Sequence, residues 1–129
     1  NLALRDGRVN KDEVDYINFH GTSTLINDKV ETLAVKETFN SQAMNIPSSS
    51  TKSMVGHPQG ASGALGVTVS ALSLKNGFMT PTINMENPDP ECDMDYVANI
   101  GREGKIKVAV SNCISFGSKN SAIVLKNFE

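Results

Sequence analysis

Two histidines are the residues of this chain best suited to chemistry, and each stands where a functional side chain is expected. His20 ends a segment rich in Val, Tyr, Ile and Phe and precedes Gly21-Thr22-Ser23-Thr24, while His57 precedes a glycine-rich segment. Strand ends and helix starts of α/β proteins commonly face a ligand crevice. Two neutral imidazoles in such a crevice could donate hydrogen bonds to a developing oxyanion or shuttle protons. The alternative is one surface histidine and one structural histidine.

The other candidate side chains have simpler interpretations. Lys52 lies five residues before His57, where a solvated surface lysine would be ordinary. Cys92 stands in an acidic turn whose charges disfavour a reactive thiolate, and Cys113 at a probable strand end is typical of a small buried residue. No third ligand stands at a recognisable spacing to complete a zinc site with the histidines. The sequence therefore contains no clear candidate for a catalytic nucleophile.

The overall composition excludes several classes of partner. The chain has 129 residues and a formal net charge of -2, and this length fits one domain or part of a larger one. Its 12 basic and 14 acidic residues are scattered, which argues against nucleic acid or an acidic membrane as a partner. The longest weakly polar run, 64–74, is too short to cross a bilayer, and no signal peptide is visible. With two cysteines and no disulfide framework, a reducing intracellular setting is expected.

The hydrophobic patterns predict a mixed α/β arrangement that would carry these residues. Residues 14–20 are typical of a strand and residues 28–39 of an amphipathic helix. Asp28 and Glu31 have the spacing of a capping box at the start of that helix. Near the end of the chain, two further strands are expected at residues 106–111 and 122–126. A hairpin-like connection around residues 115–119 would join them.

A second helix, expected over residues 60–75, has an unusual composition. Gly60, Gly63 and Gly66 recur at three-residue spacing, and each glycine in a helix interior costs up to ~1 kcal/mol relative to alanine. Close approach of another backbone would offset that cost, so the sequence predicts a centrally buried helix. Asn76-Gly77 is a natural end for it.

Four blocks of sequence stand in a characteristic order. The first is 14–24, ending in His-Gly-Thr-Ser-Thr, with Asp28 and Glu31 after it; the second is Ser-Thr-Lys-Ser-Met-Val-Gly-His at 50–57, followed by Gly-Ala-Ser-Gly-Ala. The third is Pro-Thr-Ile-Asn at 81–84 with the Pro-rich stretch 87–93, and the fourth is Ser111-Asn112 with Phe116-Gly117 and Asn120. Together these blocks resemble the β-ketoacyl-ACP synthases of the KAS I/II type, which are condensing enzymes of the thiolase-like superfamily.

The resemblance implies the thiolase-like fold, and specifically the C-terminal half of its αβαβα five-layer body over residues 1–129. The N-terminal half, which carries the nucleophilic cysteine of the family, would lie outside this chain. The opening residues agree, because 1–7 resemble the tail of a helix stopped by Gly7. Homodimers of the complete enzyme are expected, located in the cytoplasm, or in a plastid or the mitochondrial matrix of a eukaryote.

The resemblance also implies a mechanism. An acyl group moves from acyl carrier protein (ACP) to the cysteine of the other half, malonyl-ACP loses CO2, and the resulting carbanion attacks the acyl thioester. His20 and His57 would hold the malonyl thioester carbonyl and stabilise the enolate, and Lys52, paired with Glu31, would set the local field. This half alone should not catalyse condensation.

The resemblance assigns substrate-binding roles as well. Thr22 and Thr24 match threonines that hydrogen-bond the phosphopantetheine arm of ACP. Phe116, followed by Gly117, matches the gating phenylalanine, whose backbone N–H contributes to the oxyanion hole. The substrates travel on phosphopantetheine, and no free cofactor is expected.

Several positions depart from the family pattern. Ser115 and Ser118 replace glycines of a Gly-Phe-Gly-Gly gate, and Leu25 replaces a proline after the first histidine block. Gly66 replaces a glutamate that in some relatives helps to bind a structural monovalent cation, with positions like Asn18, Ser111 and Asn112. No metal is therefore expected.

Three alternatives to a fatty-acid condensing enzyme of the KAS II type remain. One is a ketosynthase of a polyketide pathway. Another is a non-catalytic partner that resembles the chain-length factors, which commonly lose the catalytic histidines; the retention of His20, His57 and Lys52 favours the enzyme. A thiolase acting on CoA esters would share the fold but not the two histidine blocks.

Overall fold

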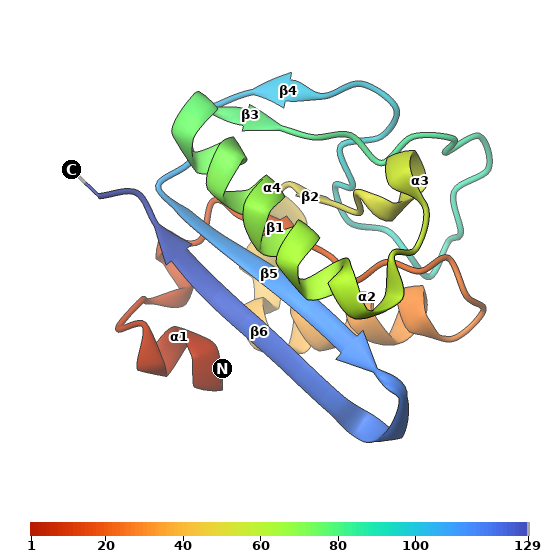
Figure 1. Cartoon of the computed structure of the whole chain (residues 1–129), viewed down its shortest axis with the longest axis horizontal. Coiled ribbons are helices and arrows are strands. Elements are labelled where there is room, and N and C mark those ends of the chain that lie inside the picture. The colour runs from red at the N-terminus through yellow and green to blue at the C-terminus, as the bar shows by residue number, and fades with distance from the viewer. Residues whose placement is uncertain (129) are drawn as a thin grey trace.

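A four-stranded sheet forms the centre of the protein. The computed structural model describes residues 1–128, and the side chain of Ser118 lies outside the description. The strand order is β2-β1-β5-β6, where β1 is Tyr16–Asn18, β2 is Ser48–Ser49, β5 is Val108–Ser115 and β6 is Lys119–Lys126. Strand β1 runs parallel to both β2 and β5, and β5 and β6 form a long antiparallel hairpin (Figure 1).

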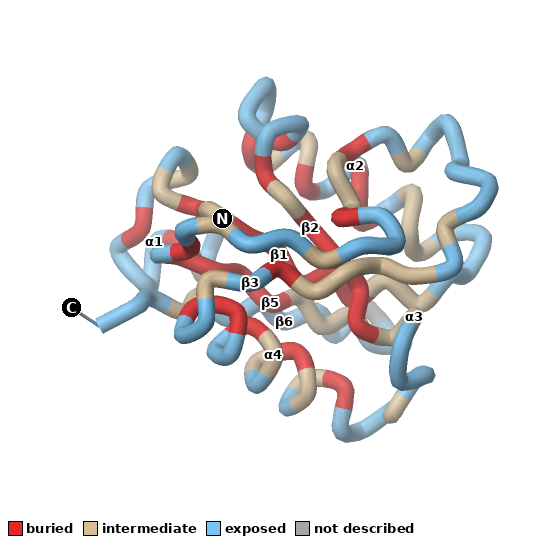
Figure 2. Tube along the Cα trace, turned by 90° about the horizontal axis from the view of Figure 1, so that it is seen from above, coloured by how far each residue is buried: buried red, intermediate tan, exposed pale blue. Residues whose placement is uncertain are grey.

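Helices cover both faces of this sheet. Helix α2 (Asn27–Phe39) lies on one face and helix α4 (Ser62–Asn76) on the other, as Figures 1 and 2 show from two directions. The smaller elements are helices α1 (Leu2–Asp6) and α3 (Lys52–Val55), and the short antiparallel pair of β3 (Phe78–Met79) and β4 (Arg102–Glu103). Short 3-10 segments occupy Lys11–Glu13, Asn40–Asn45, Gln59–Ala61 and Phe116–Ser118.

The alternation of side chains along the strands creates two apolar cores. Ile17 of β1 and Val110 of β5 pack on the α2 side with Val35 and Phe39 of that helix. The intervening Tyr16 and Ala109 pack on the α4 side with Leu74. All three residues of β1 are buried, the polar Asn18 included, and burial on both faces is typical of an inner parallel strand.

The sequence predictions of these elements are confirmed in type, with shifted boundaries. The helix expected at 28–39 is α2, and the glycine-rich helix is α4, which ends at Gly77 in the left-handed region (φ 62). The strand expected at 14–20 keeps regular pairing only at Tyr16–Asn18. The expected hairpin is present with longer strands, and the first helix, α1, ends at Gly7 in a right-handed conformation (φ -72).

The prediction that another backbone approaches the glycines of α4 is wrong. A Cβ on Gly66 would lie 2.6 Å from Ser111 Oγ and 3.1 Å from Asn18 Oδ1, so the close neighbours are side chains, while a Cβ on Gly60 would meet nothing within 4 Å. Helix α4 is also not buried all round. Its buried side carries Ser62, Gly66, Ser70, Ser73 and Leu74, whereas Leu72 on the outer side is 51% exposed. Figure 2 shows the resulting alternation of buried and exposed positions.

Within the described residues, no helix combines the length and the apolar character needed to span a membrane.

Candidate active site

His20 stands immediately beyond the inner strand β1, and its backbone is held on both sides by charged side chains. Glu31 Oε1 accepts a hydrogen bond from the His20 N–H (2.8 Å), and Glu31 Oε2 accepts one from the Gly21 N–H (2.9 Å). Lys52 Nζ donates to the His20 carbonyl oxygen (2.6 Å). Residue 20 is therefore fixed between α2 and α3, two helices that come from distant parts of the chain.

The capping-box interpretation of Asp28 and Glu31 is wrong. Glu31 is 2% exposed and points to the 20–21 backbone and to Asn112 Nδ2 (3.1 Å), while Asp28 Oδ1 accepts from the Ser23 N–H (3.1 Å). Both carboxylates thus hold the Gly-Thr-Ser-Thr loop instead of the first turn of α2. Burial raises the pKa of Glu31, and the hydrogen bonds from Gly21 and His20 oppose that rise.

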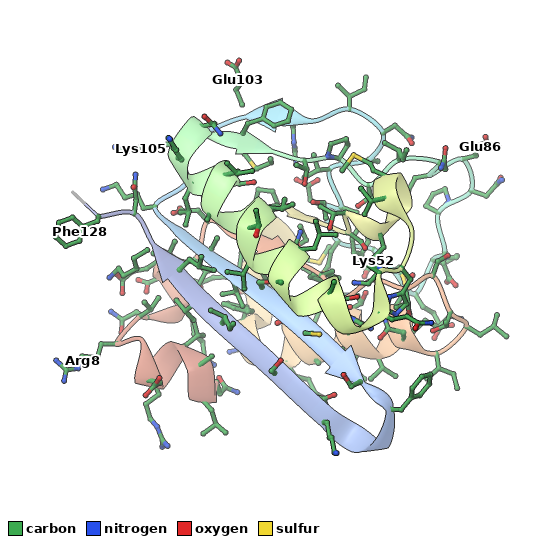
Figure 3. All side chains as sticks on the ribbon, viewed as in Figure 1. Arg8, Lys52, Glu86, Glu103, Lys105 and Phe128 are labelled. Atoms are coloured by element: carbon green, nitrogen blue, oxygen red, sulfur yellow. The ribbon has the colours of Figure 1, made fainter. Side chains whose placement is uncertain are left out.

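Lys52 does not pair directly with Glu31, contrary to the expectation from the sequence. No ion pair between described residues joins the two, and the oxygens of Glu31 accept hydrogen bonds from backbone N–H groups and amide donors. Lys52 contacts the same residue as Glu31 but on the opposite peptide group. Burial lowers the pKa of the Lys52 ammonium. Figure 3 shows this side chain near the middle of the molecule, whereas Glu86 and Glu103 lie at its outer edge.

The two imidazoles meet edge to face. Their centroids are 5.6 Å apart and their planes are inclined by 83°. His20 is 5% exposed, and burial, assisted by the charge of Lys52 and by His57, lowers its pKa to about 4. His20 is accordingly an uncharged ring at neutral pH.

The tautomer of His57 follows from its contacts. His57 Nδ1 accepts a hydrogen bond from the backbone N–H of Gln59 (3.0 Å) and lies 3.1 Å from Ser62 Oγ. A backbone N–H can only donate, so Nδ1 must be the unprotonated nitrogen, and the neutral ring carries its hydrogen on Nε2. His57 thus retains one N–H that is available to a ligand.

One open cavity of about 1940 Å³ connects the candidate residues. Its walls come from α1, α2, the loop after β1, the loop before α4, and the β5–β6 hairpin. The cavity brings together six of the nine site residues predicted from the sequence, namely His20, Thr22, Thr24, Glu31, His57 and Phe116. The other three, Asp28, Lys52 and Gly117, are not among its lining residues. Cys113, expected to be a buried filler, is half-buried and also lines this cavity.

The two threonines and Phe116 line the cavity. Thr24 Oγ1 accepts from the Asn27 N–H (3.2 Å) at the start of α2, a structural contact that the sequence did not suggest. Phe116 is fully exposed at the tip of the hairpin, and Gly117 beside it has a positive φ of 73. Ser115, in place of glycine, is extended (φ -127), so no positive φ is required there. The side chain of Ser118 falls outside the described residues.

Gly66 takes the place of the family's glutamate in a polar cluster with Asn18, Ser111 and Asn112. This position supplies no carboxylate, and a side chain there would begin within 2.6 Å of Ser111 Oγ and 3.1 Å of Asn18 Oδ1. Asn112 Nδ2 is already engaged by Glu31. The cluster therefore lacks the carboxylate that the family pattern would offer to a cation, and the absence of a metal here stays a prediction.

Sequence reasoning missed Ser62 and Gln59, which contact the Nδ1 atom of His57. A short loop folding back on a histidine is difficult to foresee, because it depends on Gln59 adopting a left-handed φ of 44, which non-glycine residues rarely take. Asn27 was missed as well; its amide nitrogen lies 3.0 Å from Asp28 Oδ1 and 3.4 Å from Glu31 Oε2.

Comparison with known proteins places this geometry in a family. Residues 1–86 match the family described as Beta-ketoacyl synthase, C-terminal domain. The 3-oxoacyl-[acyl-carrier-protein] synthase 2 of Coxiella burnetii is 48% identical over 123 residues, covering 95% of this chain and 30% of that protein. The Oxytetracycline polyketide putative beta-ketoacyl synthase 1 of Streptomyces rimosus is 47% identical over 123 residues, covering 95% of this chain and 29% of that protein.

Solved structures agree with the sequence relatives. A type II PKS acyl-carrier protein in complex with its ketosynthase superposes with a TM-score of 0.97 at 37% identity, covering 99% of this chain and 31% of that one. A beta-ketoacyl synthase from Burkholderia phymatum gives a TM-score of 0.92 at 34% identity, covering 99% and 31%. The chain spans about 30% of the length of the curated relatives it matches. Its fold is thiolase-like, and the chain belongs to the β-ketoacyl synthase family, within the region described as the C-terminal domain.

Proposed function

We propose that this chain supplies the decarboxylation residues of a 3-oxoacyl-ACP synthase of the KAS II type, acting in fatty-acid chain elongation. The observation that carries the proposal is the pair of imidazoles at one cavity, 5.6 Å apart, one buried and uncharged and the other with its Nδ1 atom occupied. Such a pair can present two N–H donors to one oxygen without itself carrying charge. The identity of 48% to a synthase of that name supports the same reaction.

In the proposed mechanism, an acyl group is first carried as a thioester on a cysteine of the N-terminal half of the enzyme. Malonyl-ACP then binds with its thioester carbonyl oxygen against Nε2–H of His20 and of His57. The bond between the α-carbon and the carboxylate breaks, CO2 leaves, and the electron pair moves into the enolate, whose oxyanion the two N–H groups stabilise. The α-carbon attacks the acyl carbonyl, and the cysteine thiolate is released.

The electrostatic surroundings favour neutral donors. The Lys52 ammonium lies against the His20 carbonyl and opposes a second positive charge on the ring, and burial of His20 acts in the same direction. A charged imidazolium would form an ion pair with the malonyl carboxylate and so slow the loss of CO2. A neutral imidazole forms no such ion pair. Lys52 and Glu31 act in this scheme by holding residue 20, and Asp28 by holding the loop that follows.

The same proposal assigns roles to the two threonines and the gate residues. Thr22 and Thr24 hydrogen-bond the phosphopantetheine arm of ACP, and the Phe116 N–H completes the oxyanion hole for the acyl carbonyl, with Gly117 giving the gate its turn. The remaining polypeptide, the N-terminal half, covers the open side of the cavity. Exposed apolar residues along that side, Ile26 at 73% and Val30 at 54%, support a covering partner, and the complete enzyme is proposed to be a homodimer.

The test separates decarboxylation from acyl transfer in the assembled enzyme, meaning this chain together with the half that carries the cysteine. With that cysteine replaced by alanine, release of CO2 from malonyl-ACP reports decarboxylation alone. We expect His57→Ala to lower this rate by a factor of about 100 or more, since a single oxyanion donor is worth roughly 3–4 kcal/mol. Acylation of an intact cysteine by acyl-ACP should persist in the same variant. Undiminished CO2 release would contradict the proposal.

A further inference from the structure

Ser62 is a buried polar residue whose side chain contacts a ring of the candidate site. It is 6% exposed and is the first residue of α4, and its hydroxyl lies 3.1 Å from His57 Nδ1. Because Nδ1 is unprotonated, the hydroxyl is the donor in this contact. No other hydrogen bond to the Ser62 side chain is found among the described residues.

The rest of the surroundings leave His57 loosely held. The ring is exposed and lies in an irregular segment between Gly56 and Gln59, both of which have a positive φ. The N–H of Gln59 comes from a single exposed turn, whereas Ser62 belongs to a helix that packs closely on the sheet through Gly66. Of the two donors to Nδ1, Ser62 is therefore the one anchored to the body of the protein.

We propose that Ser62 is a positioning residue for His57: its hydroxyl, by donating to Nδ1, holds the ring in the orientation that directs the Nε2–H into the cavity, while the Gln59 N–H sets the tautomer. The proposal rests on the proposed function and deepens it. Ser62 touches no reacting atom; it restricts rotation of the imidazole so that the donor is already oriented when the thioester binds. The expected loss on its removal is in kcat, because orientation matters most where charge develops in the transition state.

Helix α4 offers a matched control. Ser70 lies two turns further along the same buried face and is completely buried, but its hydroxyl donates to the carbonyl oxygen of Gly66 within the helix (2.8 Å). A serine that serves only to satisfy the helix would behave in the same way at both positions. Comparing Ser62→Ala with Ser70→Ala therefore separates positioning from a general effect of losing a buried hydroxyl.

The experiment uses the assembled enzyme and measures kcat and KM for decarboxylation of malonyl-ACP. A hydrogen bond of ordinary strength corresponds to a factor of about 3–10, so Ser62→Ala should lower kcat by about that factor with KM changed less than about twofold. Ser62→Thr, which keeps the hydroxyl, should restore most of the rate, and Ser70→Ala should match the parent. If Ser62→Ala and Ser70→Ala have the same kcat while His57→Ala loses activity, the inference is overturned and the proposed function stands. If His57→Ala is fully active, the proposed function itself fails.

A second readout does not depend on turnover. Nitrogen NMR of the assembled enzyme with ¹⁵N-labelled histidine distinguishes a protonated ring nitrogen from one that accepts a hydrogen bond. In the parent we expect His57 Nδ1 to give the signal of an acceptor with two donors, and in Ser62→Ala we expect that signal to shift toward that of a more weakly hydrogen-bonded acceptor, because only the Gln59 N–H remains. A His57 ring that carries its hydrogen on Nδ1 in the parent, or that is unchanged in Ser62→Ala, would overturn the inference.

Discussion

At the scale of single residues, the charge state of His20 is set by its position more than by its partners. The ring is buried directly after an inner strand, and its Nδ1 atom has no hydrogen-bond partner among the described residues. An imidazolium there would be a poorly solvated cation close to the ammonium of Lys52, which is why the folded protein keeps the ring neutral. The candidate site thus obtains an uncharged donor without a dedicated carboxylate partner.

This burial predicts a dependence of stability on pH. In the unfolded chain residue 20 would titrate near its ordinary pKa of 6.5, whereas in the folded protein its pKa is about 4. The unfolded state therefore binds the extra proton between these values, so the contribution to stability is complete above pH 6.5 and is lost as the pH falls toward 4. By pH 5 we expect this group to lower the free energy of unfolding by about 2 kcal/mol.

Urea or thermal unfolding of the assembled enzyme at pH 7 and pH 5 provides the measurement. The matched variant is His20→Gln, which keeps a polar side chain of similar size but has no group that titrates in this range. The fall in stability between the two pH values should be smaller in the variant by the stated amount. An equal fall in both proteins would show that His20 titrates normally in the folded state.

At the scale of elements, the packing of helix α4 on the sheet requires a glycine at position 66 but not at position 63. A Cβ at Gly66 would press on Ser111 Oγ at 2.6 Å, while a Cβ at Gly63 would make an ordinary contact with Cys113 Sγ at 3.9 Å. The same substitution should consequently have opposite effects at two positions a single turn apart.

We expect Gly66→Ala to lower the free energy of unfolding by about 1–2 kcal/mol through overpacking against the sheet. Gly63→Ala should be neutral or should stabilise by about 0.5–1 kcal/mol, because alanine is the better helix former. Denaturant unfolding of the two variants in the same assembled enzyme checks the difference. Equal effects at the two sites would mean that Ser111 and Asn18 move aside without cost.

At the scale of the whole molecule, the sequence predicted the elements better than the contacts among the candidate residues. The helices at α2 and α4 follow from apolar spacing and glycine endings, and the hairpin follows from turn residues; all of these are local signals. The roles of Glu31 and Lys52 depend on segments that meet only after folding, so Glu31 was assigned to its own helix and Lys52 to the wrong partner. The fold and the family were predictable because four sequence motifs occur in a characteristic order. The hydrogen bond from Lys52 to the His20 carbonyl joins residues 32 positions apart, and no local sequence pattern indicates it.

The open cavity makes a prediction about the chain on its own. It holds the two imidazoles but, within the described residues, no thiol that the proposed mechanism uses as a nucleophile, and its apolar lining includes the fully exposed Phe116. We expect this chain expressed alone to form no 3-oxoacyl product from acyl-ACP and malonyl-ACP, and the same chain mixed with its N-terminal half to form it. Product formation by the isolated chain, checked by mass spectrometry, would contradict the assignment of the nucleophile to the other half.

The hydrogen bonds that hold the backbone of residue 20 allow its side chain to change during evolution without a change in the loop. Both peptide groups that flank His20 are tied down through main-chain atoms, by Glu31 on one side and Lys52 on the other, so the imidazole contributes little to the shape of the loop. If the proposed function holds, a mutation that removes the ring would abolish decarboxylation and leave these two backbone hydrogen bonds in place. A catalytically inactive homologous subunit could therefore arise from such a gene by a single substitution at residue 20, with the fold unchanged.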